Sequence, residues 1–124
     1  MGTLTSFGKY LFAIPFAIFG IMHFMNASEM AVMVPSWLPA EEVLVYITGL
    51  AFILAAVSIV IGKKDKLAAT LLGVMLIIFV LTMHLPGVIN APDEQMMQMS
   101  MSNLLKDLML GGAAWMYAHS LARD

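Results

Sequence analysis

The sequence predicts an all-α integral membrane protein, a single domain over residues 1–124 built as a bundle of four spanning helices. Of its 124 residues, 61% are hydrophobic and 11% are charged, whereas a soluble domain carries about 25% charged residues. The mean hydropathy is +0.91. Four apolar stretches approach the length of about 20 residues that a bilayer-spanning helix needs. This composition excludes a water-soluble globular protein, a disordered tail and a nucleic-acid binder, and makes the lipid bilayer the expected partner.

The predicted spans cover about residues 4–25, 43–61, 67–88 and 104–121. No small-x-small cleavage site follows the first stretch, so we interpret it as a retained helix rather than a signal peptide. The second contains no charge, and the third is the most apolar. The fourth is the weakest, because Lys106, Asp107 and His119 interrupt it. Its Gly111 and Gly112 would allow close packing against a neighbouring helix.

Basic residues predict how the bundle is oriented. Lys63, Lys64 and Lys66 lie between the second and third predicted helices, Lys9 lies near the start of the chain and Arg123 near its end. The other two loops contain no lysine or arginine. Because cytoplasmic loops carry an excess of basic residues, both termini are expected in the cytoplasm.

The loop between the first two predicted helices is unusually apolar. It reads NASEMAVMVPSWLPAEE, with Pro35, Trp37 and Pro39 in its second half. Such a segment is expected to lie in the membrane interface or to fold back over the outer mouth of the bundle.

Three ionisable side chains fall at one level beneath that loop. His23 lies near the outer end of the first predicted helix, His84 near that of the third, and Lys106 just inside that of the fourth. Polar groups within a membrane are costly and often functional. The pattern predicts a ligand site, for example for a quinone headgroup, whose carbonyl oxygens histidine and lysine could hydrogen-bond and protonate.

Other interpretations stay open. The three residues could be simply interfacial, with Lys106 paired with Asp107 or with a lipid phosphate, in a structural or partner-anchoring protein that has no small-molecule site. Alternatively His23 and His84 could hold a haem, since imidazoles are common axial ligands. The sequence identifies no catalytic residue and no substrate.

Methionine is abundant, with 13 residues in the chain. Four of them cluster in the predicted loop 90–103: Met96, Met97, Met99 and Met101. Thioethers bind Cu(I), so this cluster could capture copper. Methionine is also a flexible apolar filler, and a short helix lying on the bilayer would explain the cluster equally well. Cysteine is absent, which excludes thiolate metal sites and Cys-x-x-Cys redox chemistry in this chain, and we assign no metal ligand.

Several segments resemble the DoxX family of small bacterial four-helix membrane proteins. They are PFAIFGIMHF, VPSWLP, VYITGL, LPGVIN and LLKDLMLGGA. The resemblance implies a multi-pass protein of the bacterial inner membrane, a membrane subunit associated with a quinone-linked oxidoreductase. Its partner would be a soluble or membrane oxidoreductase subunit, and the chain could also form a homo-oligomer.

The residues that match the family's pattern are His23, Pro35, Pro39, Gly49 and Lys106. The chain departs from the pattern after Gly49, where many relatives carry a glutamate and this sequence continues Leu-Ala-Phe. The missing carboxylate weakens the case for proton transfer at that position.

Overall fold

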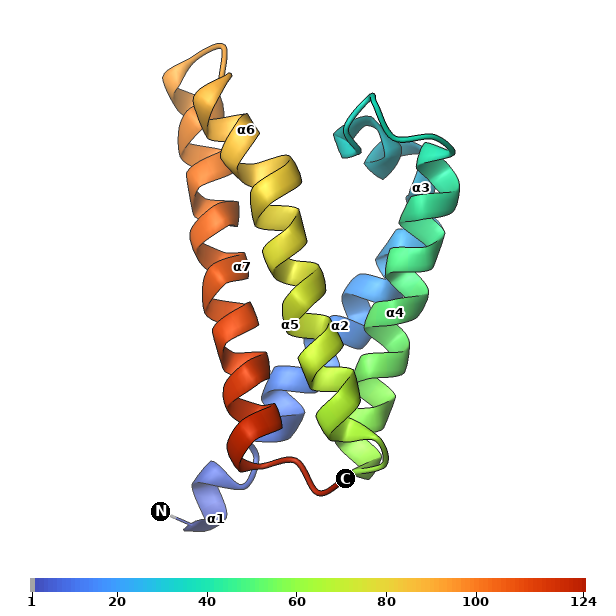
Figure 1. Ribbon diagram of the computed structural model, residues 1–124, viewed down its shortest axis with the longest axis vertical. Helices are drawn as coiled ribbons and strands as arrows, with labels where there is room; N and C mark the ends of the chain where they lie inside the picture. Colours follow the sequence, from blue (N-terminus) through green and yellow to red (C-terminus); the bar gives the residue numbers. More distant parts are fainter. Residues whose placement is uncertain (1) are drawn as a thin grey trace.

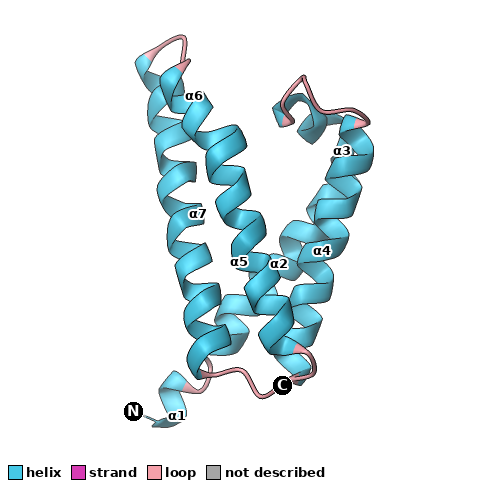
Figure 2. Cartoon of the chain, viewed as in Figure 1, coloured by secondary structure: helices cyan, strands magenta, loops and turns pink. Residues whose placement is uncertain are grey.

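The computed structural model describes residues 2–124, and all regular structure within them is helical (Figure 2). The elements are α1 (Gly2–Thr5), α2 (Gly8–Met25), α3 (Ala27–Met30), the 3-10 turn η1 (Ala31–Met33), α4 (Glu41–Ile61), α5 (Asp65–Phe79), the π-helical turn η2 (Val80–His84), α6 (Leu85–Ile89) and α7 (Glu94–Ser120). The predicted all-α class is confirmed for these residues.

The long helices form two antiparallel pairs. Helix α2 packs along α4, α5 packs along α7, and α4 joins the pairs by contacting α5 (Figure 1). The pairs meet at the end that holds α1 and the C-terminal residues, and they diverge toward the opposite end. We call these the closed end and the open end.

Small side chains hold the helices together. The main buried cluster runs from the closed end to the base of the open end and combines a few large residues, such as Phe16, Phe52 and Leu72, with many alanines. The buried alanines are Ala13, Ala55, Ala56, Ala69, Ala114 and Ala118. In a lipid environment helices associate through close van der Waals packing rather than the hydrophobic effect, and small residues permit that approach.

Two glycines mark where α2 crosses α4. A Cβ added to Gly20 would lie 2.6 Å from the carbonyl oxygen of Gly49 and 2.5 Å from Ile53 Cγ1. A Cβ on Gly49 would lie 2.7 Å from the Cβ of His23. Only glycine therefore fits at this crossing, which also fixes where His23 enters the bundle.

The C-terminal residues are tied to the start of α5 by one buried carboxylate. Asp65 has no exposed surface. It accepts hydrogen bonds from Tyr117 Oη at 2.7 Å and from the backbone N–H groups of Arg123 at 3.0 Å and Asp124 at 2.9 Å. The carboxylate thus satisfies backbone donors that follow α7 and anchors the closed end.

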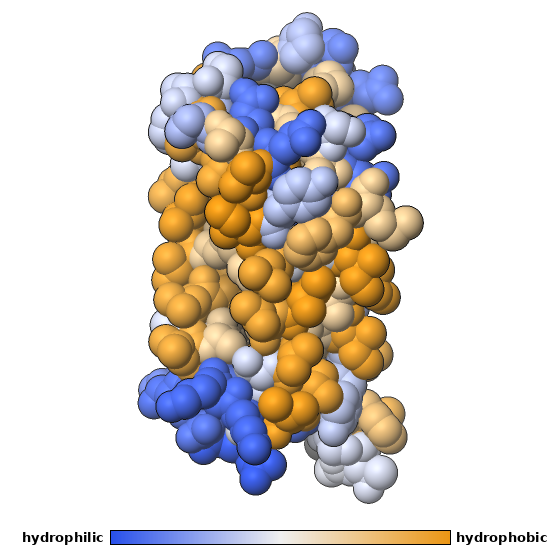
Figure 3. Space-filling view, turned by 90° about the vertical axis from the view of Figure 1, so that its right-hand side faces the viewer, coloured by the Kyte–Doolittle hydropathy of each residue, from blue (hydrophilic) through white to orange (hydrophobic). Residues whose placement is uncertain are grey.

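Three helical segments among residues 2–124 are long and apolar enough to cross a membrane: Gly2–Met25, Glu41–Ile61 and Asp65–Ile89. They coincide with the first three predicted spans, whereas α7 does not meet the same standard of hydropathy. A broad apolar band separates two hydrophilic ends of the surface (Figure 3). Length and composition are therefore compatible with a membrane protein.

The fourth predicted helix begins about ten residues too late. Helix α7 starts at Glu94, where the carboxylate of Asp93 accepts a hydrogen bond from the Met96 N–H at 2.8 Å. This aspartate satisfies one of the free N–H groups of the first turn, so the helix can begin there. The segment predicted as the loop 90–103 is therefore largely helical, and its four methionines lie on α7.

The third predicted span is helical throughout but changes its winding. Between α5 and α6 the chain forms the π-helical turn η2, which ends at His84. Pro86 follows, and a proline lacks an N–H and crowds the carbonyl four residues before it. The wider π turn includes Thr82, the residue whose carbonyl Pro86 would crowd in a regular α-helix. Such π turns are frequent at functional sites.

Candidate functional site

A cavity of about 430 Å³ lies between the two helix pairs at the open end. Side chains from α2, α4, α5, η2 and α7 line it, together with the segment from Met30 to Leu38. Its walls are mainly apolar, with Phe16, Phe19 and Phe52 among them. The volume lies within the range of about 300–1,000 Å³ that is typical of small-molecule sites.

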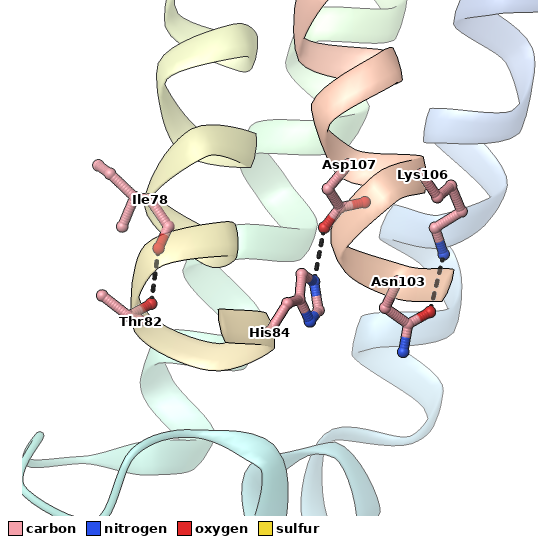
Figure 4. A network of polar contacts seen from close by, with 6 residues as sticks. All are labelled: Ile78, Thr82, His84, Asn103, Lys106 and Asp107. Carbon is pink, nitrogen blue, oxygen red and sulfur yellow. Dashed lines mark hydrogen bonds and ion pairs between the residues drawn. The ribbon is translucent and has the colours of Figure 1, made fainter. Parts of the chain in front are cut away.

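A hydrogen-bonded pair of histidine and aspartate is the main polar feature of the cavity. His84 Nε2 lies 2.7 Å from Asp107 Oδ2 and donates a hydrogen bond to it (Figure 4). The two side chains are 11% and 10% exposed, and both line the cavity. The π turn brings His84 to face α7, so the change in winding positions the pair.

Sequence reasoning missed Asp107 as a site residue and considered it only as a partner of Lys106. The structure pairs it with His84 instead. Adjacent residues of a helix project in different directions, so Lys106 and Asp107 do not face the same neighbour. The available signal was that no other acidic residue lies in the interior of a predicted span.

His23 occupies the opposite wall, on α2. Its Nδ1 donates a hydrogen bond to the carbonyl oxygen of Phe19 at 2.6 Å. The ring meets Phe52 edge-on, with 5.2 Å between the ring centroids. Within residues 2–124 no hydrogen-bond partner occupies Nε2, so this nitrogen can accept a hydrogen bond from a ligand.

Lys106 lies at the margin of the cavity, where α7 faces α2. Its Nζ lies 3.5 Å from Asn103 Oδ1 (Figure 4) and 5.7 Å from the centroid of the Phe19 ring. The latter distance permits a cation–π contact across the gap between the helices. The side chain is exposed, so the ammonium group can turn toward an incoming ligand.

The loop predicted to cover the site contributes directly to its lining. Pro35 and Trp37 line the cavity, whereas Pro39 does not. Packing of Ala27 and Ala31 against Val45 fixes the start of the loop on α4. Trp37 remains 71% exposed. The cavity therefore brings together His23, His84 and Lys106 beneath part of the loop that the sequence indicated.

No group of three or more histidine, cysteine or carboxylate side chains in residues 2–124 is placed to hold a metal ion. Met96, Met97, Met99 and Met101 lie in the first turns of α7. At about 100° per residue Met97 and Met101 share one face of the helix and Met96 and Met99 share another, so the four thioethers do not gather on one face.

The family model described as Domain of unknown function (DUF8561) matches residues 12–118. The chain belongs to this family. The match runs from α2 almost to the end of α7 and includes every polar side chain of the cavity. No curated protein matches the chain, and no solved structure does. The resemblance to the DoxX family stays a prediction.

Proposed function

We propose that the chain binds a quinone or a similar lipid-soluble ligand in the cavity at the open end. In this proposal it is a membrane subunit associated with a quinone-linked oxidoreductase, as its resemblance to the DoxX family implies. The observation that carries the proposal is an apolar cavity of about 430 Å³ in which His84, Asp107, His23 and Lys106 meet. Apolar walls with a few convergent polar groups are typical of ligand sites.

The topology belongs to the same proposal. Helix α7 has 27 residues and would extend about 40 Å, which exceeds the apolar thickness of a bilayer. It packs along α5, and both chain ends lie at the closed end (Figure 1). We therefore propose α7 as a fourth span. The lysines of the α4–α5 turn then place the closed end in the cytoplasm and the cavity in the outer leaflet of a bacterial inner membrane.

The polar groups of the cavity suit both states of a quinone. Asp107 accepts the Nε2 hydrogen of His84, which fixes the ring and leaves Nδ1 for a ligand. A neutral Nδ1 accepts a hydrogen bond from a quinol hydroxyl, and a protonated one donates to a quinone carbonyl. The Lys106 ammonium donates to a carbonyl as well. Electrons would come from the associated oxidoreductase subunit.

Quinone binding can be measured directly on the purified protein. Quinones quench tryptophan fluorescence, and Trp37 lines the cavity. Titration with a short-chain ubiquinone is expected to quench the emission until the site is saturated. Each of the variants His84→Ala, His23→Ala and Lys106→Ala is expected to raise the Kd at least tenfold. His119→Ala is the matched control, because His119 is exposed at the closed end.

The same titration separates this proposal from the alternatives. A structural or anchoring protein would show linear, unsaturable quenching that the three cavity variants leave unchanged. Native mass spectrometry that finds only phospholipid on freshly purified protein, together with such quenching, would reject quinone binding. A Soret band in fresh protein would favour haem between His23 and His84.

A further inference from the structure

A second hollow lies between α4 and α5 and shares no lining residue with the first cavity. Its volume is about 360 Å³. Its base is formed by three small side chains that repeat at helical spacing on one face of α4, Ala51, Ala55 and Ser58. Because these side chains are short, a hollow remains between the helices. The side chains of Leu54 and Leu71 border it and are both 57% exposed. The hollow therefore opens to the apolar surroundings of the bundle.

Positive charge gathers where this groove reaches the closed end. Lys64 lines the groove, Lys63 precedes it in the same turn and is exposed, and Lys66 is exposed on the first turn of α5. Two nearby carboxylates offset part of this charge, but Arg123, whose side chain lies against Gly62, adds a fourth cation, so the turn keeps a net positive charge. The carboxylate of Asp65 is buried and accepts donors from the C-terminal residues, and the carboxylate of Asp124 accepts the backbone N–H of Lys64 at 3.1 Å.

The backbone of Lys64 is held in an unusual conformation. Its φ is +56°, in the left-handed region that favours glycine and asparagine. Two hydrogen bonds fix it, one from its N–H to Asp124 Oδ2 and one to its carbonyl oxygen from the N–H of Ala68 at 2.9 Å. The turn therefore presents Lys64 to the groove in a fixed position, although a lysine is not the residue that this conformation prefers.

We propose that this groove is a binding site for an anionic phospholipid. Its phosphate would lie at Lys64 and Lys63, Lys66 would add to the positive potential of the turn, and one acyl chain would lie along the groove. Along α5 the groove runs from Lys64 to Met75, a distance of about 16 Å at about 1.5 Å per residue. This length matches a long stretch of a lipid acyl chain. Basic residues beside a groove between spanning helices are the chemistry that recognises acidic headgroups.

Lipid selectivity tests the proposal on the full chain. Purified protein in detergent is incubated with dioleoyl phosphatidylglycerol or with dioleoyl phosphatidylcholine, and native mass spectrometry measures the fraction that retains one lipid. We expect at least tenfold stronger retention of phosphatidylglycerol. The triple variant Lys63→Gln, Lys64→Asn, Lys66→Gln should lower its retention to the level of phosphatidylcholine, since each lysine contributes about fivefold.

Matched controls distinguish lipid binding in the groove from general electrostatic attraction of an anionic lipid to the basic end of the protein. Lys9→Gln removes one charge from the same end but away from the groove, and should leave retention unchanged. Asparagine at position 64 suits the left-handed backbone, so the triple variant should keep the melting temperature of the wild type. Ala51→Phe fills the groove with every lysine intact and should lower retention at least fivefold. Gly112→Phe, where an added Cβ meets nothing within 4 Å, should not.

Three results would overturn the proposal: equal retention of the two lipids, an effect of Lys9→Gln as large as that of the triple variant, or unchanged retention in Ala51→Phe. None of these measurements depends on quinone binding, because the two hollows have no residue in common.

Discussion

The closed and open ends of the bundle are built from the same helices but use their polar groups differently. At the closed end, alanines let the helices touch, and Asp65 is surrounded by protein donors. At the open end the helix pairs diverge, and polar side chains line a cavity. One end is stabilised by internal contacts, and the other has polar groups whose hydrogen-bonding capacity the described residues leave partly unused.

The two buried aspartates show this difference most clearly. Asp65 is fully buried and accepts three hydrogen bonds from the protein. The side chain of Asp107 is 10% exposed, and within the described residues its carboxylate has His84 as its one hydrogen-bond partner. A carboxylate oxygen accepts more than one hydrogen bond. Burial is therefore common to both aspartates, and unused hydrogen-bonding capacity beside a cavity is what distinguishes Asp107 and supports the proposed site.

The largest effect on stability is expected from Asp65→Ala. The change leaves Tyr117 Oη and the N–H groups of Arg123 and Asp124 without their acceptor at the closed end. Loss of several buried hydrogen bonds to one charged group should lower the free energy of unfolding by about 3–5 kcal/mol. Unfolding in a detergent–denaturant titration measures it.

Asp93→Ala is the control at the open end. It removes one exposed cap of α7, the hydrogen bond from the Met96 N–H, and should lower stability by about 1 kcal/mol. If both variants lost the same amount, the closed end would not be the main anchor of the bundle.

The next largest effect is expected where α2 crosses α4. Gly20→Ala places a Cβ 2.6 Å from a backbone carbonyl oxygen, which a rotamer change cannot relieve. The helices must separate, and stability should fall by about 2 kcal/mol. Gly112→Ala meets open space and should be neutral or stabilise by up to about 1 kcal/mol, since alanine favours a helix over glycine. Equal melting temperatures for the two variants would contradict the close crossing.

The parts of the fold that depend on composition could be predicted from the sequence. The first three spans follow from apolar length, and the positions of His23, His84 and Lys106 within the first, third and fourth predicted spans indicate a shared level. The structure places all three around one cavity. Lys106 nevertheless lies near the middle of α7 rather than near its start, because α7 begins at Glu94 and its first turns extend past the residues that line the cavity.

The remaining features depend on contacts that periodicity does not encode. The start of α7 depends on the cap at Asp93, within a segment whose polar side chains indicated a loop. Asp107 was assigned to its sequence neighbour Lys106, because the direction of a side chain across the bundle depends on helix rotation. The π turn rotates His84 toward Asp107, and only Pro86 hinted at such a change in winding.

Asp107→Asn should separate binding from stability at the open end. The amide keeps the size of the carboxylate but loses the charge that pairs with His84. Because the cavity can admit water to the remaining polar groups, we expect a loss of about 1–2 kcal/mol, less than for Asp65→Ala. Short-chain ubiquinone should bind at least tenfold more weakly. A loss of stability as large as that of Asp65→Ala would show that the His84–Asp107 pair is mainly structural.

The two tryptophans provide the finest test of the contrast between the ends. Trp115 covers Gly73 at the closed end, and its Nε1 donates a hydrogen bond to the carbonyl oxygen of Thr70 at 3.1 Å. Trp115→Phe loses this bond and should lower the free energy of unfolding by about 1 kcal/mol. Trp37 is 71% exposed at the open end, so Trp37→Phe should change stability by less than about 0.5 kcal/mol. Trp37→Phe is instead expected to abolish the fluorescence change that ubiquinone causes. If Trp115→Phe removed that signal instead, the ligand would lie near the closed end, and the assignment of the two ends would have to be reversed.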